Sequence, residues 1–234
     1  MSTVLFTASG PRRRTRHQRL RRLSALLIAA GSLVLADAGL TVLWQEPVTA
    51  VLALVQRGHL DRHWLSLRTA PLSAADRRIV GSLTESSRRI AYLAGREQRG
   101  LRPGDAAGRI AIPRLGASLL FVQGTDGVSL AKGPGHYPAT ALPGQGRTVA
   151  IAGHRTTFLA PFRHLDALRP GDRIEAIMPY GRFVYVVQRR RIVSPTAWWI
   201  TRSTGHERLV LSACDPPFSA ARRLVVFARL QSAA

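Results

Sequence analysis

The chain has 234 residues, a length that suits one domain of common size with an additional segment. Its formal net charge of +21 predicts attraction to polyanions, and charge alone does not choose among nucleic acid, anionic lipid and anionic cell-wall polymer. The single cysteine, Cys214, excludes an intramolecular disulfide and a thiolate zinc cluster.

The N-terminal part of the sequence has the pattern of a membrane anchor. Residues 1–22 contain seven arginines between positions 12 and 22 and no apolar period, which predicts a basic tail without regular structure. Residues 23–44 contain the run LSALLIAAGSLVLADAGLTVL, which has the ~20 residues that an apolar helix needs to cross a bilayer. Since arginines precede this run and no comparable basic block follows at once, the positive-inside rule predicts a single-pass anchor with a cytoplasmic N-terminus and the rest of the chain outside.

One acidic residue, Asp37, interrupts the apolar run. Near a helix centre it costs roughly 2.5–3.5 kcal/mol on insertion scales. The leucine, isoleucine and valine residues around it each contribute ~0.3–0.6 kcal/mol in favour of insertion, so a spanning helix remains favourable. A cleaved signal peptide is the alternative because Ala36-Asp37-Ala38 is loosely A-x-A-like, although the run is longer than the apolar region of a usual signal peptide.

Residues 45–105 are expected to form a helical spacer. Within this segment, between residues 73 and 99, apolar residues recur at a spacing that predicts a one-sided helix. They are Ile79, Val80, Leu83, Ile90 and Leu93. A break is predicted at residues 101–105, where a proline and a glycine follow each other.

Residues 106–234 are expected to form an all-β domain. Seven or eight short β-rich runs alternate there with glycine and proline turns, which predicts a barrel or sandwich rather than a parallel α/β fold. The runs are RIAIPRL, SLLFVQG, RTVAIAG, RIEAIMP, RFVYVVQRRRIV, RLVLSAC and RLVVFARL. Pro179-Tyr180-Gly181 predicts a hairpin turn, and the segment 169–172 predicts a turn that enters a strand.

Cys214 lies at the end of a predicted strand, which Asp215 and two prolines then stop. A side chain at such a position is rigidly held and still reachable, which favours a nucleophile over the alternative of a small buried hydrophobe. His154 ends a second predicted strand, after Gly153, and histidine can both accept and donate the proton that thiol chemistry moves.

An arginine near the start of the last predicted strand completes the candidate set. Arg223 could direct its guanidinium toward Cys214 and stabilise developing oxyanion charge, if the two strands are neighbours. Arg222 is the alternative, because side chains alternate along a strand and only one of the two can face the site.

Two segments of the sequence resemble the sortase family. Gly153-His-Arg-Thr-Thr-Phe158 with the following residues up to Asp172 resembles the histidine segment of sortases, and LVLSACDPPFSAARRLVVFARL at 209–230 resembles their cysteine–arginine segment. The runs RIAIP at 109–113 and GPGHYP at 133–138 also match. The resemblance covers roughly residues 107–231 and is greatest to the class E sortases of high-GC Gram-positive bacteria.

This resemblance implies a closed β-barrel of about eight strands with short helices. It implies a cysteine transpeptidase, a thiol peptidase by class, that cleaves a C-terminal sorting signal of the LAxTG or LPxTG type between Thr and Gly. The acyl group would rest on the cysteine as a thioester, and an amine of the peptidoglycan precursor or of another protein would release it. The expected partners are therefore surface proteins that carry the signal and an amine acceptor. The predicted anchor adds the membrane. Nucleic acid is not expected, because the main domain would lie outside the cell and no helix-turn-helix or zinc pattern occurs.

The family's functional residues carry over onto matching positions of this chain. The catalytic set is Cys214 as nucleophile, His154 as acid/base and Arg223 as substrate and oxyanion stabiliser. The expected substrate-binding residues are Thr156, Thr157, Ser212 and Ala213. The sequence departs from the family at Ser212-Ala213, before the cysteine, where a threonine is usual, and at Phe158-Leu159, where class E members often carry Tyr-Gly.

No cofactor or metal is expected. His59 and His63 are spaced i, i+4 on a predicted helix, but no HExxH pattern and no third ligand accompany them. His136 is expected to be a loop residue that packs near the site. The alternative to an enzyme is a non-catalytic, anchored cationic β-domain that binds anionic cell-wall polymer.

Overall fold

The computed structural model describes residues 12–44 and 47–234, with side chains from residue 17 to 39 and from 58 onward. The chain divides between Pro47 and Val48 into two compact units.

The first unit contains one long helix, α1 (Arg12–Trp44). The basic segment was expected to lack regular structure, and for residues 12–22 the structure differs, because these residues form the first part of α1. Arginine is a good helix former, so a helix can extend from the apolar run into the basic segment at little cost. The expectation for residues 1–11 lies outside the described residues.

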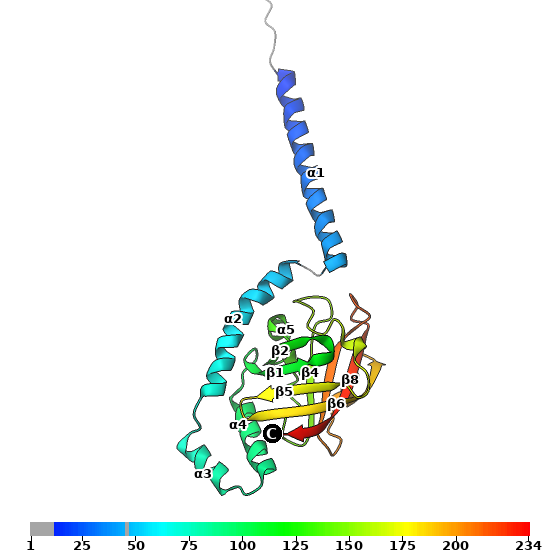
Figure 1. Cartoon of the computed structure of the whole chain (residues 1–234). Helices are drawn as coiled ribbons and strands as arrows, with labels where there is room; N and C mark the ends of the chain where they lie inside the picture. The colour runs from blue at the N-terminus through cyan, green and yellow to red at the C-terminus, as the bar shows by residue number, and fades with distance from the viewer. Residues whose placement is uncertain (1–11, 45–46) are drawn as a thin grey trace, which may run out of the picture. The chain divides into compact units, whose positions relative to one another are not determined.

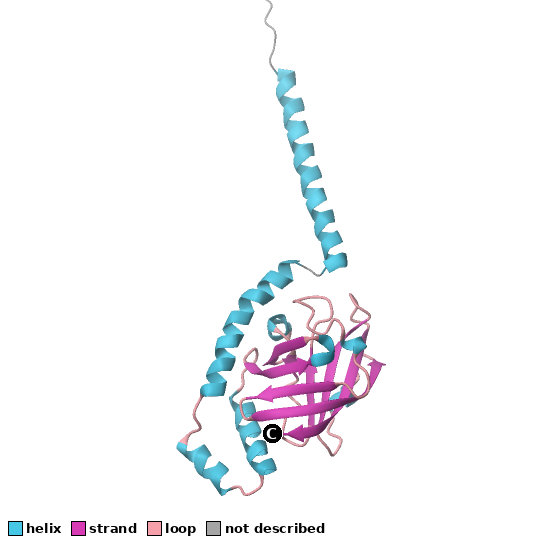
Figure 2. Cartoon of the chain, in the orientation of Figure 1, coloured by secondary structure: helices cyan, strands magenta, loops and turns pink. Residues whose placement is uncertain are grey.

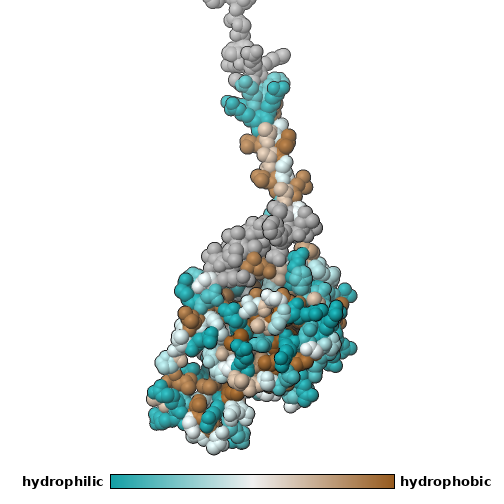
Figure 3. Space-filling model, viewed as in Figure 1, coloured by the Kyte–Doolittle hydropathy of each residue, from teal (hydrophilic) through white to brown (hydrophobic). Residues whose placement is uncertain are grey.

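Among the described residues, one segment, His17–Gly39, is long and apolar enough to cross a membrane, and none of it is buried. Its exposed apolar side chains are Leu20, Leu23, Leu26, Leu27, Ile28, Leu33, Val34 and Leu35. Figure 3 shows apolar surface, coloured brown, along the described part of the helix. Exposed leucines on every side of a helix are unfavourable in water, so this helix fits a single-pass membrane anchor.

Three helices begin the second unit: α2 (Pro47–Thr69), α3 (Ala74–Ser82) and α4 (Ser86–Gly100). One continuous helix was predicted for residues 73–99, and the structure instead has α3 and α4 separated by an extended Leu83. Ser73 caps α3, because its hydroxyl accepts a hydrogen bond from the Asp76 N–H at 3.0 Å. The helix α4 ends at Gly100, next to the predicted break.

Two of these helices pack directly on the barrel. On α2, Leu60 and Trp64 are each 5% exposed and join a small cluster with Ala106 and Val122 of the first two strands. On α4, Ala94 is fully buried in the main core cluster. The segment expected to be a spacer therefore contributes to the packing of the β-domain.

Eight strands close into a barrel in the order β1-β2-β3-β4-β7-β8-β6-β5 (Figures 1 and 2). The strands are β1 (Ala106–Ile112), β2 (Ala117–Gln123), β3 (Gly135–His136), β4 (Thr148–Ala152), β5 (Arg173–Met178), β6 (Gly181–Val193), β7 (Arg208–Asp215) and β8 (Arg222–Ala233). The connections contain a short helix, α5 (Gly127–Lys132), and the 3-10 turns η1 (Pro113–Leu115), η2 (Leu165–Ala167) and η3 (Trp198–Thr201). The pairs β2–β3 and β4–β7 are parallel, and the other neighbours are antiparallel.

The predicted β-rich runs correspond to every strand except β3, so the expected closed barrel of about eight strands is confirmed. The predicted hairpin is also confirmed, because Met178 pairs with Gly181 across a two-residue turn. The predicted turn at 169–172 is closed by the Asp172 N–H, which donates to the Arg169 carbonyl at 3.1 Å.

The barrel interior is filled by alternate residues of each strand. Along β6, Phe183, Tyr185 and Val187 point inward and are at most 2% exposed. The Tyr185 hydroxyl donates a 2.6 Å hydrogen bond to the buried Glu207 carboxylate. Burial, followed by the charge of Glu207, raises the pKa of Tyr185 well above its ordinary value, so the phenol keeps its proton. Glu207 also accepts two backbone N–H groups, from Gly144 and Gly146.

Candidate active site

Three neighbouring strands bring the predicted catalytic residues to one level of the barrel. The parallel strands β4 and β7 pair Ala152 with Ser212, so His154 and Cys214 each follow two residues beyond the same register point. The antiparallel strands β7 and β8 pair Cys214 directly with Arg223. Neighbouring strands lie about 4.8 Å apart, so the backbones that carry His154, Cys214 and Arg223 lie side by side.

The register also decides which side chains share a face. Ala213 pairs with Leu224, and both side chains are buried in the barrel core. Cys214 and Arg223 are therefore on the opposite, outer face, where both are partly exposed. Arg222 pairs with Asp215 instead, so Arg223 is the arginine that shares the face of Cys214.

The Arg223 guanidinium is engaged by the turn between β7 and β8. Its Nη1 donates to the carbonyl oxygens of Ala220 at 2.9 Å and of Arg222 at 3.0 Å. These bonds anchor one end of the guanidinium and leave its other nitrogen atoms available for a substrate carbonyl.

His154 lies at the start of a tightly packed loop. The N–H of Gly153, just before it, donates to the Ser212 carbonyl at 2.9 Å, and its own carbonyl accepts from the Phe162 N–H at 3.0 Å. A Cβ atom on Gly153 would lie 2.5 Å from the Phe162 ring, so a glycine is required for this approach. The His154 ring packs against Phe158 with 5.0 Å between ring centroids.

The loop after His154 contains a strained turn. Phe158, Leu159 and Ala160 have φ angles of 49°, 64° and 43°, a left-handed conformation that residues other than glycine rarely adopt. Such strain persists only where the surrounding structure imposes it, and it is concentrated at functional sites. Phe158 and Leu159, the two positions at which the sequence departs from a Tyr-Gly pattern, both lie in this strained turn.

The four residues predicted to bind substrate differ in their exposure: two are buried and two are partly exposed. Ser212 is 2% exposed, and its hydroxyl lies 3.2 Å from the hydroxyl of Tyr137. Ala213 is directed into the core, so its side chain is not available to a substrate, and a contact with it would be through its backbone. Thr156 and Thr157 are partly exposed in the loop after His154, and their role stays a prediction.

Two charged residues at the site were not singled out from the sequence. Arg155 directly follows His154, and its Nη1 lies 2.7 Å from Oδ1 of Asp215, which directly follows Cys214. Both side chains are buried, at 6% and 10% exposure. In the sequence, the sign of this ion pair is that the residue after His154 and the residue after Cys214 have opposite charges. It indicates a contact only once β4 and β7 are known to be neighbours.

His136 was expected in a loop that packs near the site, and the loop position is wrong. It lies in β3, is fully buried, and has its Nε2 2.9 Å from the Ala141 carbonyl and its Nδ1 2.8 Å from the Gln123 side-chain amide. Burial lowers the pKa of His136 to about 4. It is therefore a neutral, structural histidine at physiological pH.

Residues of β6, of β8 and of the loop between β6 and β7 form an aromatic and cationic group on the outer face. Trp199 stacks on Phe227 with 5.8 Å between ring centroids, and the Arg191 guanidinium lies 6.0 Å from the Trp199 ring. Trp198 beside it is 73% exposed. The Arg191 guanidinium is placed over the Trp199 ring for a cation–π contact on this outer face.

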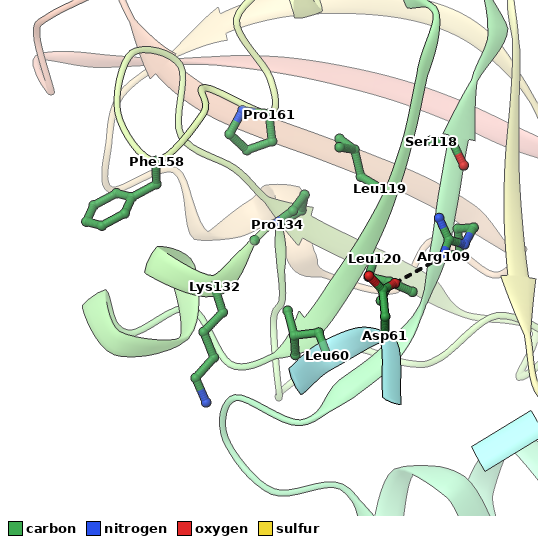
Figure 4. Close-up of a pocket in the computed structure, with 11 residues that line it drawn as sticks. Leu60, Asp61, Arg109, Ser118, Leu119, Leu120, Lys132, Pro134, Phe158 and Pro161 are labelled. Atoms are coloured by element: carbon green, nitrogen blue, oxygen red, sulfur yellow. Dashed lines mark ion pairs between the residues drawn. The ribbon is translucent and has the colours of Figure 1, made fainter. Parts of the chain in front are cut away.

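A small cavity of about 130 Å³ lies beside the loop that carries His154 (Figure 4). It is lined by Leu60 and Asp61 of α2, by β1, β2 and the end of α5, and by Phe158 and Pro161 of the loop. Asp61 and Arg109 form an ion pair of 3.6 Å across it. Pockets for cofactors usually exceed about 300 Å³, so this cavity has room for a side chain rather than a cofactor.

In the part of the chain that the structure describes, no group of three or more His, Cys, Asp or Glu side chains is arranged to hold a metal ion. His63, one of the two spaced histidines, instead accepts the Ala106 N–H at 3.1 Å.

Comparison with known proteins identifies the family of this β-domain. Residues 110–231, more than half of the chain, match the family described as the sortase domain. A sortase D of Bacillus subtilis (strain 168) is 35% identical over 114 residues, which are 48% of this chain and 56% of that protein. In the three curated relatives the matched region spans 41% to 56% of the relative's own length.

Solved structures show the same fold. Sortase E from Streptomyces avermitilis superimposes with a TM-score of 0.52 at 31% identity, over 57% of this chain and 92% of that chain. Sortase E1 from Streptomyces coelicolor, solved with a tripeptide in its active site, gives 0.54 at 25% identity, over 57% of this chain and 93% of that chain. The chain belongs to the sortase family, and class E sortases are among its structural neighbours.

Proposed function

We propose that this protein is a membrane-anchored cysteine transpeptidase that transfers surface proteins to an amine of the cell wall. Cys214 is the nucleophile, His154 the acid/base and Arg223 the oxyanion stabiliser. The observation that carries the proposal is the strand register, in which Cys214 pairs with Arg223 on β8 and aligns with His154 beyond β4. Membership of the sortase family supports the same assignment.

The first half-reaction forms an acyl-enzyme. The Cys214 thiolate attacks the carbonyl carbon of the signal's threonine, and N–H groups of Arg223 donate to the oxygen as it becomes negative. Protonated His154 gives its proton to the leaving glycine nitrogen as the carbon–nitrogen bond breaks. The products are a thioester on Cys214, neutral His154 and the released C-terminal peptide.

The second half-reaction reverses these roles. An acceptor amine attacks the thioester carbonyl, and His154 takes the proton from the attacking nitrogen. The carbon–sulfur bond then breaks, which restores the thiolate and the protonated histidine. Protons and bonds balance over the cycle without a cofactor.

The proposed substrates are surface proteins with an LAxTG- or LPxTG-like signal, and the proposed acceptor is an amine of the peptidoglycan precursor or of another protein. These follow from the resemblance to class E sortases. Thr156 and Thr157 would line the path of the signal on the outer face. The buried Ser212 would support this path from beneath through its contact with Tyr137, and Ala213 would contribute through its backbone.

The proposed location is the cell membrane, with one span, a cytoplasmic N-terminus and the barrel outside. The arginines that precede the apolar helix support this orientation. The single cysteine gives a direct test, because a membrane-impermeant maleimide should label Cys214 in intact cells. Labelling only after the cells are broken would contradict the orientation, and a mature protein that lacks the N-terminal segment would identify a cleaved signal peptide.

The catalytic proposal is tested with the full chain in detergent micelles. After incubation with an LAxTG-type peptide and a glycine-based amine, mass spectrometry should find an acyl adduct on Cys214 and a ligated product. Cys214→Ala should give neither, with an unchanged circular dichroism spectrum. Turnover by that variant would refute the nucleophile assignment. A folded wild-type chain that forms no adduct with LAxTG- or LPxTG-type peptides would favour a non-catalytic module that binds anionic wall polymer.

A further inference from the structure

The residues that directly follow His154 and Cys214 form a buried ion pair. Arg155 Nη1 lies 2.7 Å from Asp215 Oδ1, and the two side chains are 6% and 10% exposed. The pair therefore joins the loop that carries His154 to the end of the strand that carries Cys214.

Arg155 also makes weaker contacts around the same position. Its Nη1 donates to the Cys214 carbonyl at 3.4 Å, and its Nε donates to the Arg163 carbonyl at 3.4 Å. Its Nη2 lies 3.3 Å from Oδ2 of Asp166, a side chain that is 55% exposed. One planar guanidinium thus contacts the end of β7 and two points of the loop after His154, which a lysine amine could not do in the same geometry.

Arg155 contacts two carboxylates, and their burial determines which contact can fix the geometry of the site. An exposed ion pair such as Arg155–Asp166 is screened by water and contributes little. A buried pair such as Arg155–Asp215 also gains little net stability over apolar residues of similar volume, because both charges lose their hydration. What a buried pair does provide is a fixed, directional contact, so its effect is expected in the geometry of the site more than in stability.

We propose that Arg155 is a positioning residue whose ion pair with Asp215 fixes the His154 loop against the end of β7 and thereby sets the relative position of His154 and Cys214. The inference rests on the proposed transpeptidase function. Proton transfer between two side chains requires placement within hydrogen-bond reach, and a misplacement of about 1 Å costs on the order of 100-fold in rate.

The test uses the full chain in detergent micelles and a double variant, Arg155→Met/Asp215→Leu. This variant removes both charges and leaves no unpaired ion in the core. Asp166→Asn is the matched control, because it removes the exposed partner of the same guanidinium. Three quantities are measured: kcat and KM for the LAxTG-type peptide, the thermal unfolding midpoint, and the pH profile of Cys214 alkylation by iodoacetamide.

In the double variant, kcat should fall by about 10- to 100-fold with KM changed less than about threefold and the unfolding midpoint nearly retained. The alkylation profile should move toward that of His154→Ala, since the histidine no longer acts on the thiol. Asp166→Asn should keep wild-type values. A folded double variant with wild-type kcat and a wild-type alkylation profile would overturn the proposal.

A second variant covers the case in which the double variant does not fold. Asp215→Asn keeps the volume of the side chain and one acceptor oxygen while it removes the charge, and the same loss of kcat is expected on a smaller scale. Unchanged kcat and alkylation in Asp215→Asn would count against the proposal. If the wild-type chain forms no acyl adduct, the proposed function fails, and the alkylation profiles of wild type, His154→Ala and the double variant still decide the positioning role.

Discussion

Acidification from pH 6.5 to 4 is expected to destabilise the barrel through one buried imidazole, that of His136. Burial lowers its pKa to about 4 in the folded chain, whereas an unfolded histidine has a pKa of about 6.5. The hydrogen bond between His136 Nε2 and the Ala141 carbonyl raises the pKa, but burial is the larger effect and the pKa stays low.

The sign follows from proton uptake. Between these two pKa values the unfolded chain binds a proton at this position and the folded chain does not, so the free energy of unfolding falls as the pH falls. At about 1.4 kcal/mol per pKa unit, the difference corresponds to roughly 3 kcal/mol. That is a large share of the roughly 5–15 kcal/mol by which domains are stable. The contribution of His136 is complete above pH 6.5 and lost near pH 4.

The assay is urea unfolding of the full chain in detergent, followed by tryptophan fluorescence at pH 7, 5.5 and 4. Carboxylates titrate in the same pH range and also change the free energy of unfolding. The quantity compared is therefore the free energy of unfolding of the wild type minus that of His136→Gln at each pH. This difference should fall by about 3 kcal/mol between pH 7 and 4. His206→Gln, at an exposed histidine, is the control and should show no such change. A difference that stays flat or rises would mean that His136 is charged in the fold and that the reasoning from burial is wrong.

Three further predictions concern the active site and the core. Arg223→Lys should lower kcat on the order of 100-fold without loss of stability, because a single ammonium cannot hold the β7–β8 turn and an oxyanion together; wild-type kcat in the peptide ligation assay would refute this. Gly153→Ala should lower the free energy of unfolding in urea by about 1–3 kcal/mol and also reduce kcat, since its Cβ would lie 2.5 Å from the Phe162 ring beside His154. An unchanged free energy of unfolding and an unchanged kcat would mean that the loop can move aside. Tyr185→Phe should destabilise the chain by about 1–3 kcal/mol in the same measurement, because the buried Glu207 carboxylate loses its 2.6 Å donor; kcat, measured at the other end of β7, should be unchanged.

The predicted β-domain was largely accessible from the sequence because each long strand carries its own signal. In β6, for example, Phe183, Tyr185 and Val187 alternate with more exposed residues, and Pro179-Tyr180 marks the turn before it. The strand β3 has two residues, Gly135 and His136, which is too short for any alternation. Its existence depends on β2 and β4 lying on either side of it, and this is why His136 was misplaced in a loop.

The residue types needed for thiol chemistry and their location at strand ends could be read from the amino-acid sequence, because proline and glycine stop strands through local backbone effects. The folded chain was needed to show that β4, β7 and β8 are neighbours, that Arg223 rather than Arg222 shares a face with Cys214, and that Ala213 points into the core. It alone joined Arg155 to Asp215, which are 60 positions apart in the chain. The pattern of a single strand limits its register to shifts that keep the apolar side chains inward, but it does not identify the neighbouring strand.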